Sequence, residues 1–254
     1  MSLLRSLLMT LSTYTRLPLP KVDFHEEDLR YALCFVPLAG VLVGLFFWAW
    51  AMLMQAMGIG GLLKAAGFTL IPLWVTGGFH MDGFLDTSDA LSSWQPREKK
   101  LEIMKDPHMG AFSVIQYGMY LLAMLALYSE VSTANQVVAV GLGFVLSRCL
   151  AILMCIMLPN ARGSGMIQRF QQAQPKQAVL TAATVFAFIS LVAGCVSAGY
   201  VMLLGTVAMG MMTLWFYAMA RRQFGGITGD LAGYLVQMNE LAFAAGVVLL
   251  SKLL

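Results

Sequence analysis

Three aspartates are spaced so that a helix would place their carboxylates together. Asp82, Asp86 and Asp89 follow one another at i, i+4 and i+7. At about 100° per residue these positions share one helical face along about two turns. Like charges at this spacing repel, so we expect a cation among them. Because Mg²⁺ takes oxygen ligands from carboxylates and substrate phosphates, the pattern predicts that all three aspartates bind Mg²⁺ and take part in catalysis.

A solvated helix face with a polar cap is the alternative interpretation of this segment. Capping can account for Asp82, but not for Asp89 two turns later. His80 precedes the aspartates and points away from them if the helix begins that early, so it is either catalytic or structural. Gly77 and Gly78 either let a phosphate approach the backbone or only end an apolar stretch.

A second polar segment runs from Glu102 to Gly110. Asp106 precedes Pro107, which favours an extended or turn conformation for the aspartate. We expect Asp106 to add another oxygen ligand to the metal ion and Lys105 to contact a phosphate. An ordinary turn after a helix is the alternative.

A glycine-rich segment, Gly225-Gly226-Ile227-Thr228-Gly229-Asp230, opens the last apolar stretch of the chain. A glycine-rich turn at a helix N-terminus can bind an anion because its backbone N–H groups point outward. The segment predicts that Gly225, Gly226 and Gly229 bind substrate and that Asp230 joins the metal ligands. A simple turn with a capping aspartate is the alternative.

Three further charged residues are candidates for substrate binding. Arg148 and Glu240 lie within apolar stretches, where an ionisable group is costly and suggests function by default. They are alternatively structural partners of each other. Arg162 belongs to the segment 161–165, which has the composition of a flexible phosphate-binding loop or of a plain basic loop.

The chain that carries these residues is too apolar for a water-soluble protein. Of its 254 residues, 59% are hydrophobic and 11% are charged, whereas soluble domains average about 45–50% and about 25%. So few charges cannot cover a water-facing surface, which excludes a soluble enzyme, a disordered protein and a nucleic-acid binder with a basic face. We therefore predict an all-α polytopic membrane bundle, formed as a single domain over residues 1–254.

A membrane-spanning helix needs about 20 mostly apolar residues. Seven segments meet this requirement: 33–57, 62–79, 111–129, 135–158, 177–198, 200–220 and 231–251. The fifth and sixth form one uncharged run that is too long for a single span, so we divide it near residues 194–199. Residues 1–17 are too short and too charged to span, and we expect an amphipathic helix at the membrane interface.

The basic residues predict the orientation of these spans, because cytoplasmic loops are enriched in Lys and Arg. They concentrate in the N-terminal segment and in every second loop, while only Lys64 and Lys252 fall on the other side. Most acidic residues share the basic side. We therefore expect a cytoplasmic N-terminus, an outer C-terminus and an active site on the cytoplasmic face of the membrane.

Taken together, these segments resemble the cobalamin synthase family, the adenosylcobinamide-GDP ribazoletransferases. The matching motifs occur in the expected order along nearly the whole chain: Thr15-Arg16-Leu17-Pro18-Leu19-Pro20, Gly77-Gly78-Phe79-His80-Met81-Asp82-Gly83 with Asp86 and Asp89, Glu102-Ile103-Met104-Lys105-Asp106 with Gly110, Ala161-Arg162 with Gly165, and Gly225-Gly226-Ile227-Thr228-Gly229-Asp230 with Glu240. Many members have Glu where this chain has Gln237, so we leave position 237 out of the metal site.

The resemblance implies a reaction and its participants. A ribose hydroxyl of α-ribazole, or of its 5′-phosphate, would attack the phosphorus next to the cobinamide arm of adenosylcobinamide-GDP, and GMP would leave. Mg²⁺ is the implied cofactor and the lipid bilayer the implied surroundings. A homo-oligomer and contacts with other late cobalamin-pathway enzymes are compatible with it, whereas a nucleic-acid partner is not expected.

Two other functions would use the same residues. A CDP-alcohol-type phospholipid phosphotransferase also spaces aspartates along a helix, but Phe84-Leu85-Asp86 replaces the x2-Ala-Arg part of its DG-x2-AR pattern. An ion or metal transporter would use Arg148 and Glu240 as pathway groups. Transporters place charged groups near mid-membrane on several spans, whereas here the charges crowd at one face.

Overall fold

The computed structural model of the protein describes residues 2–20 and 25–252. Helices form all of the regular structure of this part of the chain, apart from one isolated bridge between Asn160 and Ile227. The all-α prediction is therefore confirmed.

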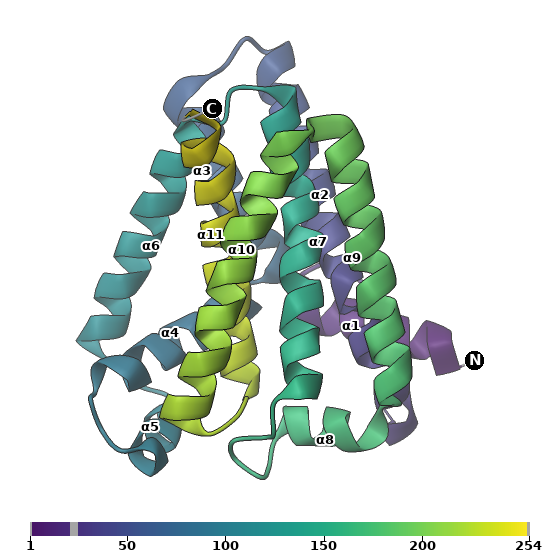
Figure 1. The fold of residues 1–254 in the computed structure, drawn as a ribbon, viewed down its shortest axis with the longest axis vertical. Coiled ribbons are helices and arrows are strands. Elements are labelled where there is room, and N and C mark those ends of the chain that lie inside the picture. Colours follow the sequence, from purple (N-terminus) through teal and green to yellow (C-terminus); the bar gives the residue numbers. More distant parts are fainter. Residues whose placement is uncertain (1, 21–24, 253–254) are drawn as a thin grey trace.

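The long helices stand side by side as a bundle, and the shorter ones lie mainly at one end of it (Figure 1). The long helices are α2 (Ala32–Ala56), α3 (Gly61–Thr76), α6 (Ala111–Ser129), α7 (Ala134–Met157), α9 (Lys176–Ala198), α10 (Tyr200–Met219) and α11 (Gly229–Leu249). The shorter ones are α1 (Ser2–Tyr14), η1 (Glu26–Tyr31), α4 (Phe79–Ser92), α5 (Arg97–Ile103), α8 (Met166–Ala173), η2 (Ala220–Phe224) and η3 (Leu250–Lys252).

Six helical segments of the described chain are long and apolar enough to cross a membrane, and a bent pair, α3 with α4, raises the number to as many as seven. The split of the long uncharged run is confirmed, since α9 ends at Ala198 and α10 begins at Tyr200. These helices make the protein a multi-pass membrane protein.

The predicted end of the second span, at residue 79, is wrong. The α3 helix ends at Thr76, and the chain then turns by 97° into α4. Gly77 and Gly78 adopt left-handed φ values of 64° and 79°, which glycine reaches at little steric cost, and this ends the helix. The turn leaves α4 outside the direction of the spans, towards the lower end of Figure 1.

The segment predicted as an amphipathic interfacial helix is α1. Its Ser6 and Thr10 side chains are buried and donate to the carbonyl oxygens of Asp28 and Ala32, at 2.7 and 2.8 Å. Leu3 and Leu4 are exposed on the outside of the bundle. An outward apolar face on a short helix fits a position at the membrane interface.

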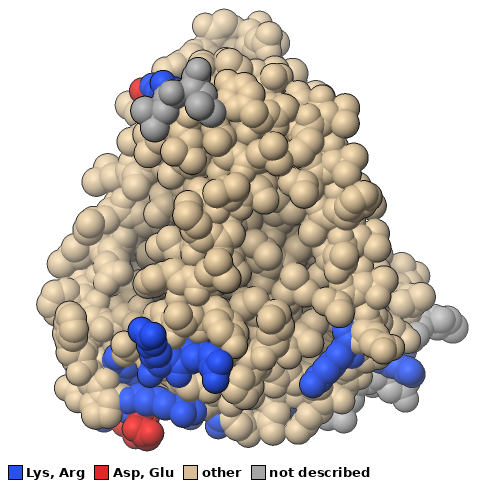
Figure 2. Space-filling model, viewed as in Figure 1, with Lys and Arg blue, Asp and Glu red and all other residues tan. Residues whose placement is uncertain are grey.

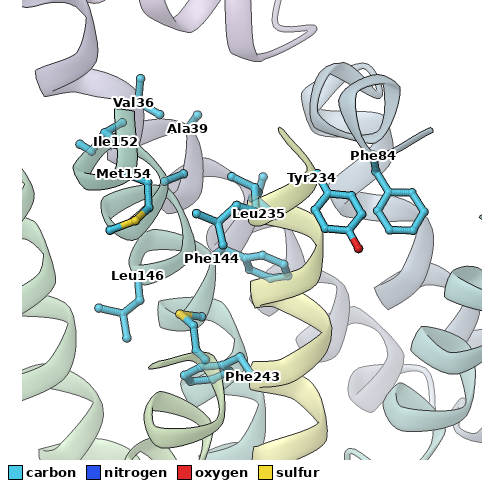
Figure 3. Close-up of a cluster of buried hydrophobic side chains, with 14 of the residues drawn as sticks. Val36, Ala39, Phe84, Phe144, Leu146, Ile152, Met154, Tyr234, Leu235 and Phe243 are labelled. Carbon is cyan, nitrogen blue, oxygen red and sulfur yellow. The ribbon is translucent and has the colours of Figure 1, made fainter. Parts of the chain in front are cut away.

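The interior of the bundle is built around α7 and α11. In the most apolar 18-residue stretch of each of these two spans, 72% and 67% of the residues are buried. The corresponding share is 22% in α6 and in α9, so these two helices are largely open to lipid. Figure 3 shows Phe144, Leu235 and Phe243 within this core. It also shows Phe84 of α4 beside Tyr234 of α11, whose rings stack at 5.4 Å and fasten α4 to the core.

Charged side chains gather at one end of the molecule. On the face shown in Figure 2, most Lys and Arg lie at the end where α5 and α8 are found, and the surface between the two ends is uncharged. Near the opposite end Lys252 pairs with Glu130. The end that carries α5 and α8 is the one that we expect in the cytoplasm.

Candidate functional site

The α4 helix meets α11 at close range because glycines lie at the contact. A Cβ atom added to Gly83 would lie 2.6 Å from the carbonyl oxygen of Asp230, and one added to Gly233 would lie 2.9 Å from that of His80. The two backbones therefore nearly touch. This contact brings the aspartates of α4 beside the first turn of α11.

An acidic cluster results, made of Asp82, Asp86 and Asp230, with Asp89 at its edge. Asp82 is exposed, while Asp86 is half-buried. Burial, followed by the carboxylates of Asp82 and Asp230, raises the pKa of Asp86 to about 7, and Asp89 has the smallest effect among the neighbouring carboxylates. The predicted convergence of the α4 aspartates with Asp230 is thus present in the fold.

Arg162 supplies a positive charge to this cluster. Its Nη2 atom lies 3.0 Å from Oδ2 of Asp230. Its charge also lowers the pKa of Asp86, against the larger effects that raise it. A cation among the carboxylates was expected from their spacing, and in the structure a guanidinium takes this position.

Backbone hydrogen bonds between residues 159–161 and Ile227 place Arg162 beside the cluster. The N–H of Ala161 donates to the carbonyl of Ile227 at 2.9 Å, and the N–H of Ile227 donates to that of Pro159 at 2.8 Å. The Oδ1 atom of Asn160 accepts from the N–H groups of Arg162 and Gly163, at 2.8 and 2.7 Å. Sequence reasoning missed Asn160, although a Pro-Asn pair is a turn signal that points to it.

The three glycines of the segment 225–230 differ in their surroundings. A Cβ atom at Gly225 would lie 2.1 Å from the Arg97 guanidinium, and one at Gly226 would lie 2.1 Å from the Pro159 carbonyl oxygen. Gly229 is exposed, and a Cβ atom there would meet no described atom within 4 Å. Protein atoms therefore pack against the first two glycines, and only Gly229 leaves room for a ligand at the N-terminus of α11.

The α5 helix fixes this segment from the other side, through residues that sequence reasoning did not single out. Arg97 donates to the Ala161 carbonyl at 3.4 Å. The buried Lys100 donates to Oε1 of Gln223 at 2.5 Å, within the π-helical turn that precedes Gly225. The basic residues of this loop predicted membrane orientation, and no sequence signal distinguished these two from the rest.

Two predicted site residues lie in the turn between α5 and α6. Asp106 is exposed, and its Oδ1 atom contacts the backbone N–H and Nδ1 of His108 at 2.9 and 2.7 Å. Lys105 is exposed as well. The side chain of Asp89 points toward this turn, since a Cβ atom at Gly110 would lie 1.9 Å from its Oδ1. The contacts of Asp106 are with its own turn, and its role as a metal ligand stays a prediction.

Arg148 and Glu240 face each other inside the bundle. Arg148 Nη1 lies 2.6 Å from Oε1 of Glu240, and the two side chains are 1% and 2% exposed. Arg148 also donates to the Phe144 carbonyl and to the Ser147 hydroxyl. The structural partnership that the sequence left open is therefore present, and the contacts of both charges lie within the protein.

His80 and Gln237 point into the protein rather than toward the carboxylates. His80 is 4% exposed, its ring stacks on Tyr14 at 5.7 Å, and burial lowers its pKa so that the imidazole is neutral. Gln237 Oε1 accepts from the Tyr120 hydroxyl at 2.6 Å. This bond supports leaving Gln237 out of the metal site.

A bundle of membrane-spanning helices with carboxylates and an arginine gathered at one end defines a multi-pass membrane protein with a polar site for a charged substrate. Residues 6–248 match the family model described as Cobalamin-5-phosphate synthase. The chain belongs to this family.

Several curated relatives are similar over nearly their full length. A protein of Lachnoclostridium phytofermentans named adenosylcobinamide-GDP ribazoletransferase is 35% identical, over 98% of this chain and 95% of its own. Proteins with the same name from Stutzerimonas stutzeri, 33% identical over 96% and 97%, and from Clostridium perfringens, 28% identical over 95% of each chain, are also similar. No solved structure gives a significant match.

Proposed function

We propose that the protein transfers the adenosylcobinamide-phosphate group of adenosylcobinamide-GDP to α-ribazole, or to its 5′-phosphate, and releases GMP. The observation that carries this proposal is the junction of α4 and α11, where Asp82, Asp86 and Asp230 meet Arg162. Membership of the family and the names of the relatives support the choice of substrates. The cytoplasmic face of a bacterial inner membrane is the proposed location.

The chemistry of the acidic cluster fits Mg²⁺. Within the described residues no group of three His, Cys, Asp or Glu side chains forms a ready-made metal cage. Mg²⁺ does not need one, because it is usually held by one or two carboxylates together with waters and substrate phosphates. Asp230 Oδ2 is paired with Arg162 at 3.0 Å, so a metal ion at this carboxylate would share it with the guanidinium or replace it. Asp82, Asp86 and Asp230 would hold the ion, which when bound supplies charge neutralisation at the transferring phosphoryl group.

The other residues bind and orient the donor. The Arg162 guanidinium, now beside Asp230, can turn to phosphate oxygens, for which its planar fork is well suited. The exposed N-terminus of α11 at Gly229 offers backbone N–H groups to the diphosphate. An open groove of about 590 Å³ beside Asp82, lined by residues of α4, α6 and the turns that precede them, would contact one side of the corrin.

In the reaction, an acceptor hydroxyl oxygen forms a bond to the phosphorus next to cobinamide, and the bond from that phosphorus to the GMP oxygen breaks. The hydroxyl proton must leave as the new bond forms. In the metal-free protein Asp86 has a pKa of about 7 and is partly protonated near neutral pH. With Mg²⁺ bound, Asp86 would be an ionised ligand, and the hydroxyl proton would pass to water or to a carboxylate oxygen that does not hold the ion.

Incubation of membranes that carry the protein with adenosylcobinamide-GDP and α-ribazole tests the proposal. We expect GMP and a cobalamin product in equal amounts when Mg²⁺ is present, and neither when the metal is chelated. Membranes without the protein are the control. Absence of GMP, or GMP release that does not depend on α-ribazole, would contradict the proposal.

A further inference from the structure

A cavity lies on the side of α4 that faces away from the acidic cluster. Its volume is about 50 Å³, and residues of α1, α2, α4, α7, α8 and α11 line it. The inner wall is apolar and buried, with Ile152, Cys155 and Val236 among its residues. Phe79, Met166 and Gly229 line it as well and are exposed, so they mark its mouth.

His80 contributes a polar side chain to the lining of this cavity. Its side chain is 4% exposed, and its Nδ1 atom has no hydrogen-bond partner within the described chain. Its ring lies nearly parallel to Tyr14, at 18°, and Phe79 packs against it edge-on, at 88°. Because an unsatisfied buried polar atom costs free energy, a ligand that completes this hydrogen bond is favoured.

The apolar walls and the single unpaired polar atom are complementary to a flat, mostly apolar ligand that has one hydrogen-bonding ring atom. A heteroaromatic base has these properties. The cavity has room for about four water molecules, and the flexible Met166 side chain at its mouth can move to widen it.

The cavity reaches the cluster only at the N-terminus of α11. Gly229 lines the cavity and is exposed, and the next residue, Asp230, is paired with Arg162. On α4, His80 and Asp82 are two residues apart and lie on opposite sides of the helix. A nucleoside whose base occupied the cavity would therefore leave it past Gly229, with its ribose next to Asp230.

We propose that this cavity is the subsite for the base of the acceptor nucleoside, with His80 hydrogen-bonded to a ring nitrogen. This inference rests on the proposed function and adds to it, because it places the selection of the base in the wall formed by α7 and α8. The volume at Cys155 and Ile152 then determines which bases the protein accepts.

Filling the inner wall tests the subsite. We expect Cys155→Leu to raise KM for α-ribazole at least about tenfold, since an added isobutyl group competes with the base for space. The KM for adenosylcobinamide-GDP should change less than about twofold. The matched control is Cys195→Leu on α9, which does not line the cavity and should leave both values unchanged.

A second acceptor separates a filled subsite from general damage. A benzimidazole riboside without the ring methyl groups should lose less affinity than α-ribazole in Cys155→Leu, whereas damage to the fold would affect both acceptors equally. If Cys155→Leu does not insert into the membrane, Ile152→Ala widens the same wall and should favour larger bases. Equal changes for both acceptors in the inserted variant would overturn the proposal.

The role of His80 is tested by exchanging its ring. We expect His80→Phe, which keeps the aromatic stack but loses the nitrogen, to raise KM for α-ribazole about tenfold, the loss of one buried hydrogen bond. His80→Asn, which restores a nitrogen near the Nδ1 position, should recover part of this loss. An unchanged KM in His80→Phe would remove His80 from the subsite.

Direct binding of radiolabelled α-ribazole, without the donor, separates this inference from the proposed function. Binding that Cys155→Leu weakens supports the subsite, even if no GMP is ever released. GMP release with α-ribazole binding insensitive to Cys155→Leu would leave the function standing and overturn the subsite.

Discussion

Asp86 occupies the centre of the acidic cluster, and its neighbours decide its protonation. Asp82 and Asp89 come from its own helix, while Asp230 and Arg162 come from distant segments. The i, i+4, i+7 spacing was sufficient to predict the first two neighbours. It could not predict Arg162, because a contact between distant loops leaves no periodic signal in the sequence.

The ligand assignment predicts unequal effects within one set of conservative substitutions. We expect Asp82→Asn and Asp86→Asn each to lower kcat/KM by about 10³-fold, because a ligand of the phosphate-bound metal contributes several kcal/mol. Asp106→Asn is the matched control, since that carboxylate is exposed and contacts its own turn. If Asp106 only stabilises its own turn, Asp106→Asn should lower kcat/KM by less than about threefold. A loss in Asp106→Asn as large as in Asp82→Asn would mean that the turn closes over the site and that Asp106 is a ligand.

The raised pKa of Asp86 predicts how Mg²⁺ dependence varies with pH. Below about pH 7 a proton occupies Asp86 in the metal-free protein, and Mg²⁺ must displace it. The half-saturating Mg²⁺ concentration should therefore rise toward about tenfold per unit as pH falls below this value. Titrations of GMP release across pH measure this slope, and Asp86→Asn should flatten it.

The raised pKa of Asp86 also affects stability. Mg²⁺ binding improves as pH rises, whereas the stability of the metal-free protein falls. A carboxyl whose folded-state pKa is raised contributes stability at low pH and loses this contribution as pH rises through the folded value. In chelator, the melting temperature should thus fall from about pH 4 to about pH 7 and level off above this range, and Mg²⁺ should reverse the fall. A stability profile in chelator that Asp86→Asn leaves unchanged would assign the effect to other groups.

At the scale of helices, the site depends on how closely α4 approaches α11. Gly83 and Gly233 allow the approach, and the stacked Phe84 and Tyr234 hold it (Figure 3). The sequence predicted both helices, including the N-terminus of α11 near Thr228. It predicted that Asp230 joins the aspartates, but not how closely the two backbones approach, because the glycines that permit the contact look the same in sequence as glycines in turns.

Gly83→Ala tests this contact. The added Cβ atom would meet Asp230 backbone at 2.6 Å, so the helices must separate, which costs about 1–3 kcal/mol and displaces the carboxylates. We expect lower kcat/KM for both substrates. Gly118→Ala on α6, where the Cβ atom meets no described atom within 4 Å, is the control. Normal activity in Gly83→Ala would show that the site tolerates a wider spacing.

The ion pair between Arg148 and Glu240 also joins two helices, α7 and α11. If Arg148 and Glu240 are structural, Glu240→Gln should lower the free energy of unfolding by about 3–5 kcal/mol, because it leaves a buried guanidinium without its counter-charge. The double variant Arg148→Met with Glu240→Leu should recover most of the loss. The measurements are thermal unfolding in detergent and the two KM values. A changed KM with normal stability would instead support the substrate-binding role.

The whole molecule concentrates its charge at one end, and this asymmetry predicts which compartment supplies the substrates. On the face shown in Figure 2, most Lys and Arg lie at the end of α5 and α8, while the opposite end is nearly bare. Hydropathy predicted most of the bundle from sequence. It placed the end of the second span at residue 79 because Phe79 continues the apolar stretch, and the alternative that Gly77-Gly78 end this stretch is confirmed. The 97° bend that follows could not be predicted, because hydropathy carries no information on direction.

Cysteine labelling measures the orientation that this asymmetry predicts. In a background without the native cysteines, Lys99→Cys and Arg222→Cys should react with a membrane-impermeant maleimide only after the inner face is opened, whereas Glu130→Cys should react in intact spheroplasts. All three positions are exposed in the structure, so a lack of reaction reports the membrane and not burial. The basic ends of α5 and of the turn after α10 would then face the cytoplasm, as the positive-inside rule requires. Labelling of Lys99→Cys from outside would place the acidic cluster on the outer face, away from nucleotide-activated substrates, and would contradict the proposed function together with the orientation.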